Sequence, residues 1–189
     1  MNIRHLTLTL GLVLLLASAG NSGEVKTKDV RCTFAATFVA GVDNHLDTNS
    51  DGRSAGVHQG IASCNIGRFI FHEVFEFQAP LQAPVTCPAG TQEIGFVQAH
   101  RVLSAEKTAD QLFVANGAGE GTLCLYPDLT FTFTEHGTIA GGTGQYAEAS
   151  GSFDGQATGK YLVFGFKEDV FGGFGQYTET VTGTLNISK

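Results

Sequence analysis

The sequence predicts a single all-β domain, an antiparallel closed β-barrel of about eight strands. Segments rich in Thr, Val and Phe alternate in polarity between glycine-rich turns, as in half-buried strands. The chain has 25 glycines and 4 prolines, and no stretch after residue 20 sustains helical periodicity, although residues 102–111 come closest to a short helix. Closing such strands into a barrel removes their exposed edges; a β-sandwich is the alternative fold.

Residues 1–19 read as an export signal rather than as part of the fold. A short polar start precedes an apolar run at residues 6–16, and Ala17-Ser18-Ala19 forms a small-residue cleavage site. The apolar run is too short to favour a membrane span. We therefore expect one barrel domain of residues 20–189 that is secreted or periplasmic.

The composition supports one packed domain and excludes several functions. Because tryptophan is absent, the 15 phenylalanines must supply much of the large apolar area. The net charge of −7 argues against nucleic acid and anionic membrane surfaces as partners. HExxH and nucleophile-elbow patterns are missing, and the glycine run at residues 141–144 has no lysine for a phosphate loop. No cofactor is expected, with calcium as the one exception.

The calcium pattern is Asp47, Asn49 and Asp51 followed by Gly52. Alternate oxygen ligands before a glycine match the start of a calcium-binding loop. The twelfth position is His58 rather than a bidentate Glu, and no flanking helices are expected. A polar turn, in which Asn and Asp bond their own backbone, is the alternative.

The four cysteines predict two disulfides. Cys32 and Cys64 lie symmetrically about the loop between the first two expected strands, residues 30–39 and 57–66, so an antiparallel pair places them face to face. Cys87 and Cys124 would form the second bridge, although four cysteines allow three pairings. In an exported chain without CxxC, disulfides are expected rather than a metal site.

The segment 68–78 is the most informative expected strand. Its alternation places on one face Phe69, Phe71, Glu73, Phe75 and Phe77. If this row faces the interior, Glu73 loses hydration, its pKa rises and it can act as a general acid or base. The alternatives are that the row faces a rim, or that Glu73 pairs with Arg68 or Arg101.

Later strands repeat the pattern. They are expected at residues 93–99, 111–115, 122–126, 129–140, 159–167 and 177–187. In one of them Phe131, Phe133 and Glu135 share a face opposite threonines, so Glu135 repeats the placement of Glu73. In the last strand Tyr177 and Glu179 share a face.

A glycine-rich motif, Gly141-Gly142-Thr143-Gly144, precedes Tyr146 and predicts a sharp turn into a strand or a bent barrel corner. Residues 172–179 repeat it partly, which we interpret as two hairpins with the same turn chemistry. The run 137–151 resembles the GGTG-[RKQ]-[FY]-x-x-A-x-G signature of allene oxide cyclase barrels and dirigent-like proteins. Residues 87–90 and 121–124 resemble elements of secreted bacterial members, so the resemblance covers about residues 85–155.

The resemblance implies an antiparallel barrel whose lumen binds a small hydrophobic molecule. Allene oxide cyclases cyclise such a molecule and dirigent proteins steer radical coupling, so an enzyme here would be a cofactor-free cyclase or isomerase. The candidate catalytic residues are Glu73 and Glu135, which are not motif-matched residues of the family. The candidate ligand contacts are Phe69, Phe71, Phe75, Phe77, Phe131, Phe133, Tyr146 and Tyr177.

A second hypothesis is a non-catalytic secreted structural or binding barrel whose phenylalanines fill the interior. Fold alone does not decide between the two. The sequence leaves the oligomeric state open, and a homo-oligomer is compatible with both.

Overall fold

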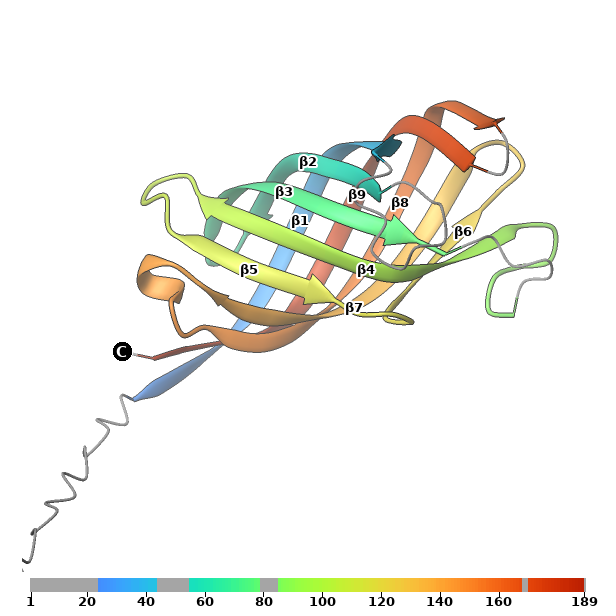
Figure 1. Ribbon diagram of the computed structural model, residues 1–189. Helices are drawn as coiled ribbons and strands as arrows, with labels where there is room; N and C mark the ends of the chain where they lie inside the picture. Colours follow the sequence, from blue (N-terminus) through green and yellow to red (C-terminus); the bar gives the residue numbers. More distant parts are fainter. Residues whose placement is uncertain (1–23, 44–54, 79–84, 168–169, 189) are drawn as a thin grey trace, which may run out of the picture.

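The computed structural model of the chain describes residues 24–43, 55–78, 85–167 and 170–188 (Figure 1). The expected export signal at 1–19 and the calcium candidates Asp47, Asn49 and Asp51 lie outside the described residues. The described strands are β1 (Val25–Asp43), β2 (Ala55–Cys64), β3 (Gly67–Phe77), β4 (Gln92–Ala105), β5 (Gln111–Asn116), β6 (Gly121–Leu125), β7 (Thr130–Gly142), β8 (Ser150–Lys167) and β9 (Val170–Ser188).

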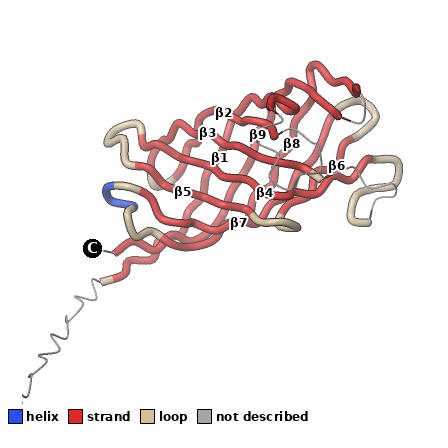
Figure 2. Tube along the Cα trace, in the orientation of Figure 1, coloured by secondary structure: helices blue, strands red, loops and turns tan. Residues whose placement is uncertain are grey.

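All of these strands belong to one antiparallel sheet, which closes on itself (Figure 2). The order β3-β2-β1-β9-β8-β7-β5-β4 is completed by pairing of β3 with β4, which gives a ring of 8 strands. Both β5 and β6 lie between β4 and β7, β5 along residues 99–104 of β4 and β6 along residues 92–95. The prediction of an all-β antiparallel fold is confirmed. We call this arrangement the strand ring.

The helical interpretation of residues 102–111 is wrong. β4 continues to Ala105, and a tight turn, in which Ala109 N–H donates to Ala105 O at 2.9 Å, leads into β5 at Gln111. Val102 and Leu103 pair with Phe113 and Leu112 across the two strands, so cross-strand pairing overrides the local pattern. β8 begins at Ser150, earlier than expected. The sequence pattern missed this first part because inward glycines interrupt the apolar alternation that indicates a strand.

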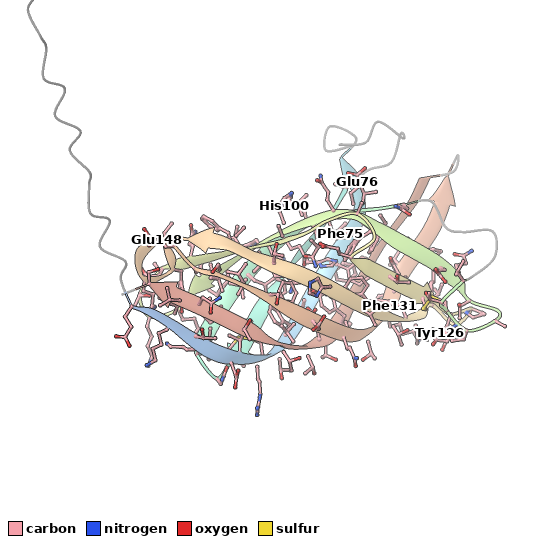
Figure 3. The ribbon with its side chains drawn as sticks, turned by 90° about the horizontal axis from the view of Figure 1, so that it is seen from below. Phe75, Glu76, His100, Tyr126, Phe131 and Glu148 are labelled. Atoms are coloured by element: carbon pink, nitrogen blue, oxygen red, sulfur yellow. A yellow bond between two sulfur atoms is a disulfide. The ribbon has the colours of Figure 1, made fainter. Side chains whose placement is uncertain are left out.

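The predicted inner faces are confirmed. The Phe69–Phe77 row, the Phe131–Glu135 row and the Tyr177–Glu179 row are all buried, and the threonines opposite the last two rows face outward. Side chains fill the interior along its whole length, from the end near Glu148 to the end near Tyr126 (Figure 3). The core is therefore the interior of the strand ring.

Both predicted disulfides are present. Cys32 and Cys64 lie directly opposite each other on β1 and β2 with their Cα atoms 4.0 Å apart, and Cys87 bonds Cys124 with Cα atoms 5.6 Å apart. The first disulfide links the neighbouring strands β1 and β2. The second ties the segment before β4 to β6.

The glycine-rich motif forms the predicted turn. Gly141 and Gly144 have φ values of 107° and 55°, which side chains disfavour, and a 3-10 turn (Gly144–Tyr146) follows. The Thr143 hydroxyl accepts a hydrogen bond from Gln111 N–H at 2.9 Å, a role that backbone reasoning missed. Tyr146 folds back and is buried with its ring 6.2 Å from that of Phe69. The motif therefore covers one end of the interior.

The partial repeat at residues 172–179 is not a second turn. It lies within β9, so the interpretation of two equivalent hairpins is wrong. A side chain at Gly173 or Gly175 would overlap the ring of Tyr161 or Phe38. These glycines leave room for aromatic rings, whereas the earlier ones serve backbone conformation.

Candidate functional site

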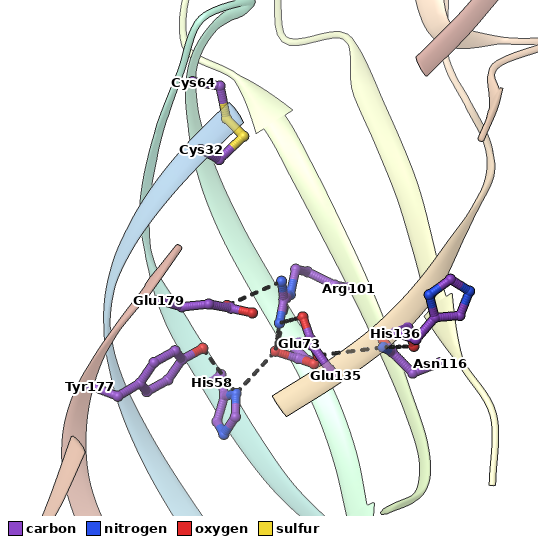
Figure 4. A network of polar contacts seen from close by, with 10 residues as sticks. All are labelled: Cys32, His58, Cys64, Glu73, Arg101, Asn116, Glu135, His136, Tyr177 and Glu179. Carbon is purple, nitrogen blue, oxygen red and sulfur yellow. Dashed lines mark hydrogen bonds and ion pairs between the residues drawn. A yellow bond between two sulfur atoms is a disulfide. The ribbon is translucent and has the colours of Figure 1, made fainter. Parts of the chain in front are cut away.

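Four strands bring charged side chains together in the middle of the interior (Figure 4). Arg101 on β4 places Nη2 3.0 Å from Glu73 Oε2 and 3.2 Å from Glu135 Oε1. Its Nη1 lies 3.4 Å from Glu179 Oε2. All four side chains are at most 3% exposed, so this is an ion cluster shielded from water.

The positions of these residues follow from strand alternation and pairing. Glu73 and Arg101 are direct partners on β3 and β4, which makes their contact local once those strands pair. Glu135 and Glu179 come from β7 and β9, and β8 runs between these two strands. Gly155 on β8 has no side chain, and a Cβ there would overlap the carboxylate of Glu179 and lie 2.7 Å from Glu135 Cγ.

Further polar groups extend the cluster on both sides. His58 Nδ1 lies 3.0 Å from Glu73 Oε2 and 3.1 Å from the Tyr177 hydroxyl oxygen. On the other side Asn116 Nδ2 donates to Glu135 Oε2 at 3.4 Å and to a backbone carbonyl at 2.7 Å. We call the set Arg101, Glu73, Glu135, Glu179, His58 and Tyr177 the arginine cluster.

Glu73 is ionised, contrary to the sequence expectation. Burial alone raises its pKa, but attraction to Arg101 and His58 and hydrogen bonds from both lower the pKa from 4.5 to about 2. The alternative interpretation, in which Glu73 pairs with Arg101, is the one that the structure contains. Glu73 is therefore a permanent hydrogen-bond acceptor at neutral pH.

Glu135 behaves in the opposite way. Burial raises its pKa well above the ordinary value, and the carboxylates of Glu179 and Glu73 oppose the attraction of Arg101. Burial lowers the pKa of Arg101, but attraction to Glu135, Glu179 and Glu73 raises it well above its ordinary value, so the guanidinium stays charged. One cation thus faces three carboxyl groups, and the raised pKa of Glu135 favours a proton on that carboxyl group.

Glu179 has spare hydrogen-bonding capacity. Among the described residues, no donor meets either carboxylate oxygen in hydrogen-bond geometry, although the side chain is buried and Oε2 lies 3.4 Å from Arg101 Nη1. A protonated Glu135 can donate to one of these oxygens, which leaves the other without a donor. A buried acceptor without a donor is rare in proteins and marks a place for a water or a ligand.

Two small cavities border Arg101. The first, which we call the aromatic cavity, has a volume of about 20 Å³, and rings from β1, β3, β4, β7, β8 and β9 surround it. Its lining residues with polar groups are His58, Arg101, Tyr161, Tyr177 and Glu179. The second has a volume of about 40 Å³ and an apolar lining that includes the Cys32–Cys64 disulfide, Phe69 and Val181. Volumes of this size hold one to a few water molecules.

The candidate ligand contacts do not converge on one pocket. Phe77, Phe131, Phe133 and Tyr177 line the aromatic cavity, whereas Phe69 lines the other cavity.

The other candidates have different surroundings. Phe71 packs 5.6 Å from the Arg101 guanidinium, and Phe75 packs 4.1 Å from the His58 ring. Tyr146 lies at the covered end and lines neither cavity, although its ring packs near Phe69, which lines the second. Both catalytic candidates, Glu73 and Glu135, are in the arginine cluster but do not line the aromatic cavity.

The polar groups that do line the aromatic cavity were mostly missed. His58 was considered only as the twelfth position of a calcium loop, and Arg101 only as a partner for Glu73. Glu179 is two residues from Tyr177 and therefore on the same inward face of the strand, and this spacing is the sequence feature that could have indicated its place in the site. Among residues 24–43, 55–78, 85–167 and 170–188, no group of three or more His, Cys, Asp or Glu side chains could hold a metal ion.

None of the helical segments in the part of the chain that the structure describes is long and apolar enough to cross a membrane. Comparisons of the chain with protein-family models, curated proteins and solved structures give no match. The geometry of the arginine cluster therefore carries the functional argument.

Proposed function

We propose that the chain is an exported barrel of the allene oxide cyclase or dirigent-like type. It binds a small, mostly apolar molecule in the aromatic cavity and guides a proton-transfer isomerisation or cyclisation. The observation that carries this proposal is a buried arginine cluster whose His58, Tyr177 and Glu179 face a cavity walled by aromatic rings. Two disulfides in the chain support an oxidising compartment.

A purely structural role accounts poorly for the arginine cluster. Buried ion groups are often replaced by apolar residues of similar volume with no loss of stability, because desolvation offsets much of their attraction. Ligand sites, by contrast, combine a largely apolar wall with a few converging polar groups. Perturbed pKa values in Glu73 and Glu135, beside such a wall, are what acid–base sites contain.

Tyr177 supplies the donor. Since Glu73 is ionised and only accepts, His58 Nδ1 must carry the hydrogen that joins them, and the Tyr177 oxygen near the same Nδ1 can also only accept. The Tyr177 hydroxyl hydrogen is then available to an oxygen atom of a ligand. Burial, with Glu73 nearby, raises the pKa of Tyr177 well above its ordinary value, so the hydroxyl stays protonated.

Glu179 supplies the acceptor. It lies two residues along β9 from Tyr177 on the same inner face, and one of its oxygens lacks a donor. A ligand whose oxygen takes a hydrogen bond from Tyr177 can lose a proton to Glu179 and regain it at another atom, which is an isomerisation without a redox partner. Glu73 and Glu135 act as positioning residues, since they orient His58 and Arg101.

Binding requires movement of the cavity walls. A volume of about 20 Å³ admits a water-sized group, so a ring-sized ligand must displace Phe77, Phe131 or Phe133. We therefore expect a compact ligand, with an oxygen at one end and no charge, because the interior already holds three carboxyl groups.

Acetophenone, a small aromatic ketone, is a suitable probe. In NMR titrations at millimolar concentration we expect shifts of resonances around the aromatic cavity. Tyr177→Phe should weaken this binding at least tenfold, whereas Tyr146→Phe, at the covered end, should leave it unchanged. Absence of any shift in the wild-type protein would count against the proposal.

A non-catalytic barrel with a packed interior is the second candidate. The small volumes of the two cavities, about 20 and 40 Å³, favour it. It predicts no acetophenone binding, and substitutions in the arginine cluster that change stability alone.

A further inference from the structure

The outer face of the strand ring carries an unbroken apolar row. Register places Val163 opposite Phe174, Phe174 opposite Val39, Val39 opposite Val57, and Val57 opposite Val74, across β8, β9, β1, β2 and β3. These side chains are 38% to 66% exposed. Directly opposed residues on neighbouring strands are in contact, so the five form one strip rather than scattered surface residues.

A second apolar row runs parallel to the first. Ala35, Ile61 and Ile70 are opposite one another on β1, β2 and β3, and Ile61 and Ile70 are 42% and 47% exposed. Uncharged Thr37 and Gln59, and His72, separate the two rows. We call the outward positions of these rows on β9, β1, β2 and β3 the uncharged face: Phe174, Gln176, Thr178, Ala35, Thr37, Val39, Val57, Gln59, Ile61, Ile70, His72 and Val74.

The uncharged face contains no Asp, Glu, Lys or Arg, although the chain has 18 acidic and 11 basic residues. Charges occur on the same outer surface nearby, at Asp29 and Arg31 of β1 and at Asp154 and Lys160 of β8. Depletion of charge around an apolar centre distinguishes the middle of protein interfaces from ordinary surface.

We infer that the uncharged face docks a second copy of this chain, face to face. Each copy has a net charge of −7, so two copies repel wherever their charged surfaces meet. The uncharged face is a region where close approach brings no such repulsion, and its exposed apolar side chains distinguish it from the outward threonine rows of β7 and β8. An identical face on the partner supplies the matching uncharged, partly apolar surface, as a two-fold interface requires.

The size of the uncharged face fits a modest dimer. Four strands about 4.8 Å apart and three rows about 6.8 Å apart cover roughly 400 Å² in plane. Side-chain relief, together with exposed Leu162 and Val163 at the edge, brings the accessible area towards the roughly 600 Å² per partner at the lower limit for specific interfaces. We expect a dissociation constant of order micromolar. This inference concerns the outer surface and stands whether or not the interior binds a ligand.

Sedimentation velocity on the oxidised protein, from about 1 to 200 μM, tests the inference. Wild type should shift from monomer to dimer over this range. Val57→Lys and Ile61→Lys should weaken association at least tenfold. Thr134→Lys, which adds the same charge on exposed β7 surface, should associate like wild type. Thermal melts establish whether each variant is folded. If the lysine variants are unfolded, Val57→Thr and Ile61→Thr replace them in the same measurement.

Three results would overturn the inference. Wild type could remain monomeric at 200 μM. Thr134→Lys could weaken association as much as Val57→Lys, which would indicate a general charge effect. Monomeric wild type could instead bind neutral phosphatidylcholine vesicles through the uncharged face, which would make lipid the occupant.

Discussion

Gly155 on β8 lies directly opposite Glu135 on β7, and the space that its missing side chain leaves is filled by the carboxyl groups of Glu135 and Glu179. The arginine cluster therefore depends on a residue with no polar atom in its side chain. This relationship gives the first prediction.

Gly155→Ala should destabilise the protein by about 1–3 kcal/mol, because the added methyl group overpacks a site already occupied by two carboxyl groups. Urea unfolding measures the free-energy change. Gly165→Ala, on the same strand with no atom within 4 Å of the new Cβ, is the matched control and should be close to neutral. Equal effects of the two substitutions would mean that strand propensity, rather than space, decides.

Glu135→Gln should make the free energy of unfolding less dependent on pH above about 4.5. The pKa of Glu135 is raised in the folded state, so its contribution is fully present below the unfolded value and is lost as pH rises through the folded value. Gln keeps the protonated shape without the titration. Urea melts at pH 4, 6 and 8 should show wild type losing stability, relative to the variant, as pH rises. A parallel pH dependence would contradict the assignment of the proton to Glu135.

Glu73 should contribute to the pH dependence of stability in the opposite direction to Glu135. Its pKa of about 2 lies below the unfolded value of 4.5, so its contribution is present above pH 4.5 and is lost as pH falls towards 2. Carbon-detected NMR should find no titration of the Glu73 carboxyl between pH 3 and 7. Glu73→Gln should destabilise by about 3–5 kcal/mol at pH 7, since it leaves Arg101 short of a buried partner. A measured pKa above 4.5 would restore the sequence expectation.

In the glycine-rich turn, Gly142→Val should be the most damaging substitution and Thr143→Val the mildest. A Cβ at Gly142 meets the backbone carbonyl of Gln111, and Gly144 has positive φ and faces Asp110. Loss of the Thr143 hydroxyl removes one hydrogen bond, about 0.5–1.5 kcal/mol. Thermal melts rank the three, with Thr143→Ser as the control that keeps the hydroxyl. If Thr143→Val melts lowest, the hydroxyl matters more than backbone conformation.

Replacing both Cys32 and Cys64 by Ala should lower stability by about 3–4 kcal/mol, since the bridge closes a loop with a sequence separation of 32 residues. Denaturant unfolding measures the loss. Non-reducing peptide mapping should find only Cys32–Cys64 and Cys87–Cys124 peptides, and any crossed peptide would contradict the pairing.

The features that could be predicted from the sequence depend on residues close together in the chain. Period-two alternation placed Glu73 between inward phenylalanines, and the loop symmetry placed Cys32 opposite Cys64, because both need only one strand or one hairpin. The sign of the pKa shift of Glu73 could not be derived, since it depends on the register between β3 and β4 that puts Arg101 beside it.

The other contacts of the site could not be predicted because they form only when all strands of the ring are paired. Glu179 reaches Arg101 only when β9 has paired with both β1 and β8, and no pattern within β9 contains that information. The space at Gly155 is likewise a property of three strands, so the sequence pattern around Gly155 indicated an interrupted strand rather than a pocket for carboxylates.

The pairing of β1 with β9, from Val25 opposite Ser188 to Ala40 opposite Gly173, joins the first and last described strands. During synthesis the ring cannot close until β9 has left the ribosome, so β1 stays without this partner until then. Since the start of β1 and the end of β9 lie side by side (Figure 1), a circular permutant that joins these two points and opens another hairpin should close into the same ring.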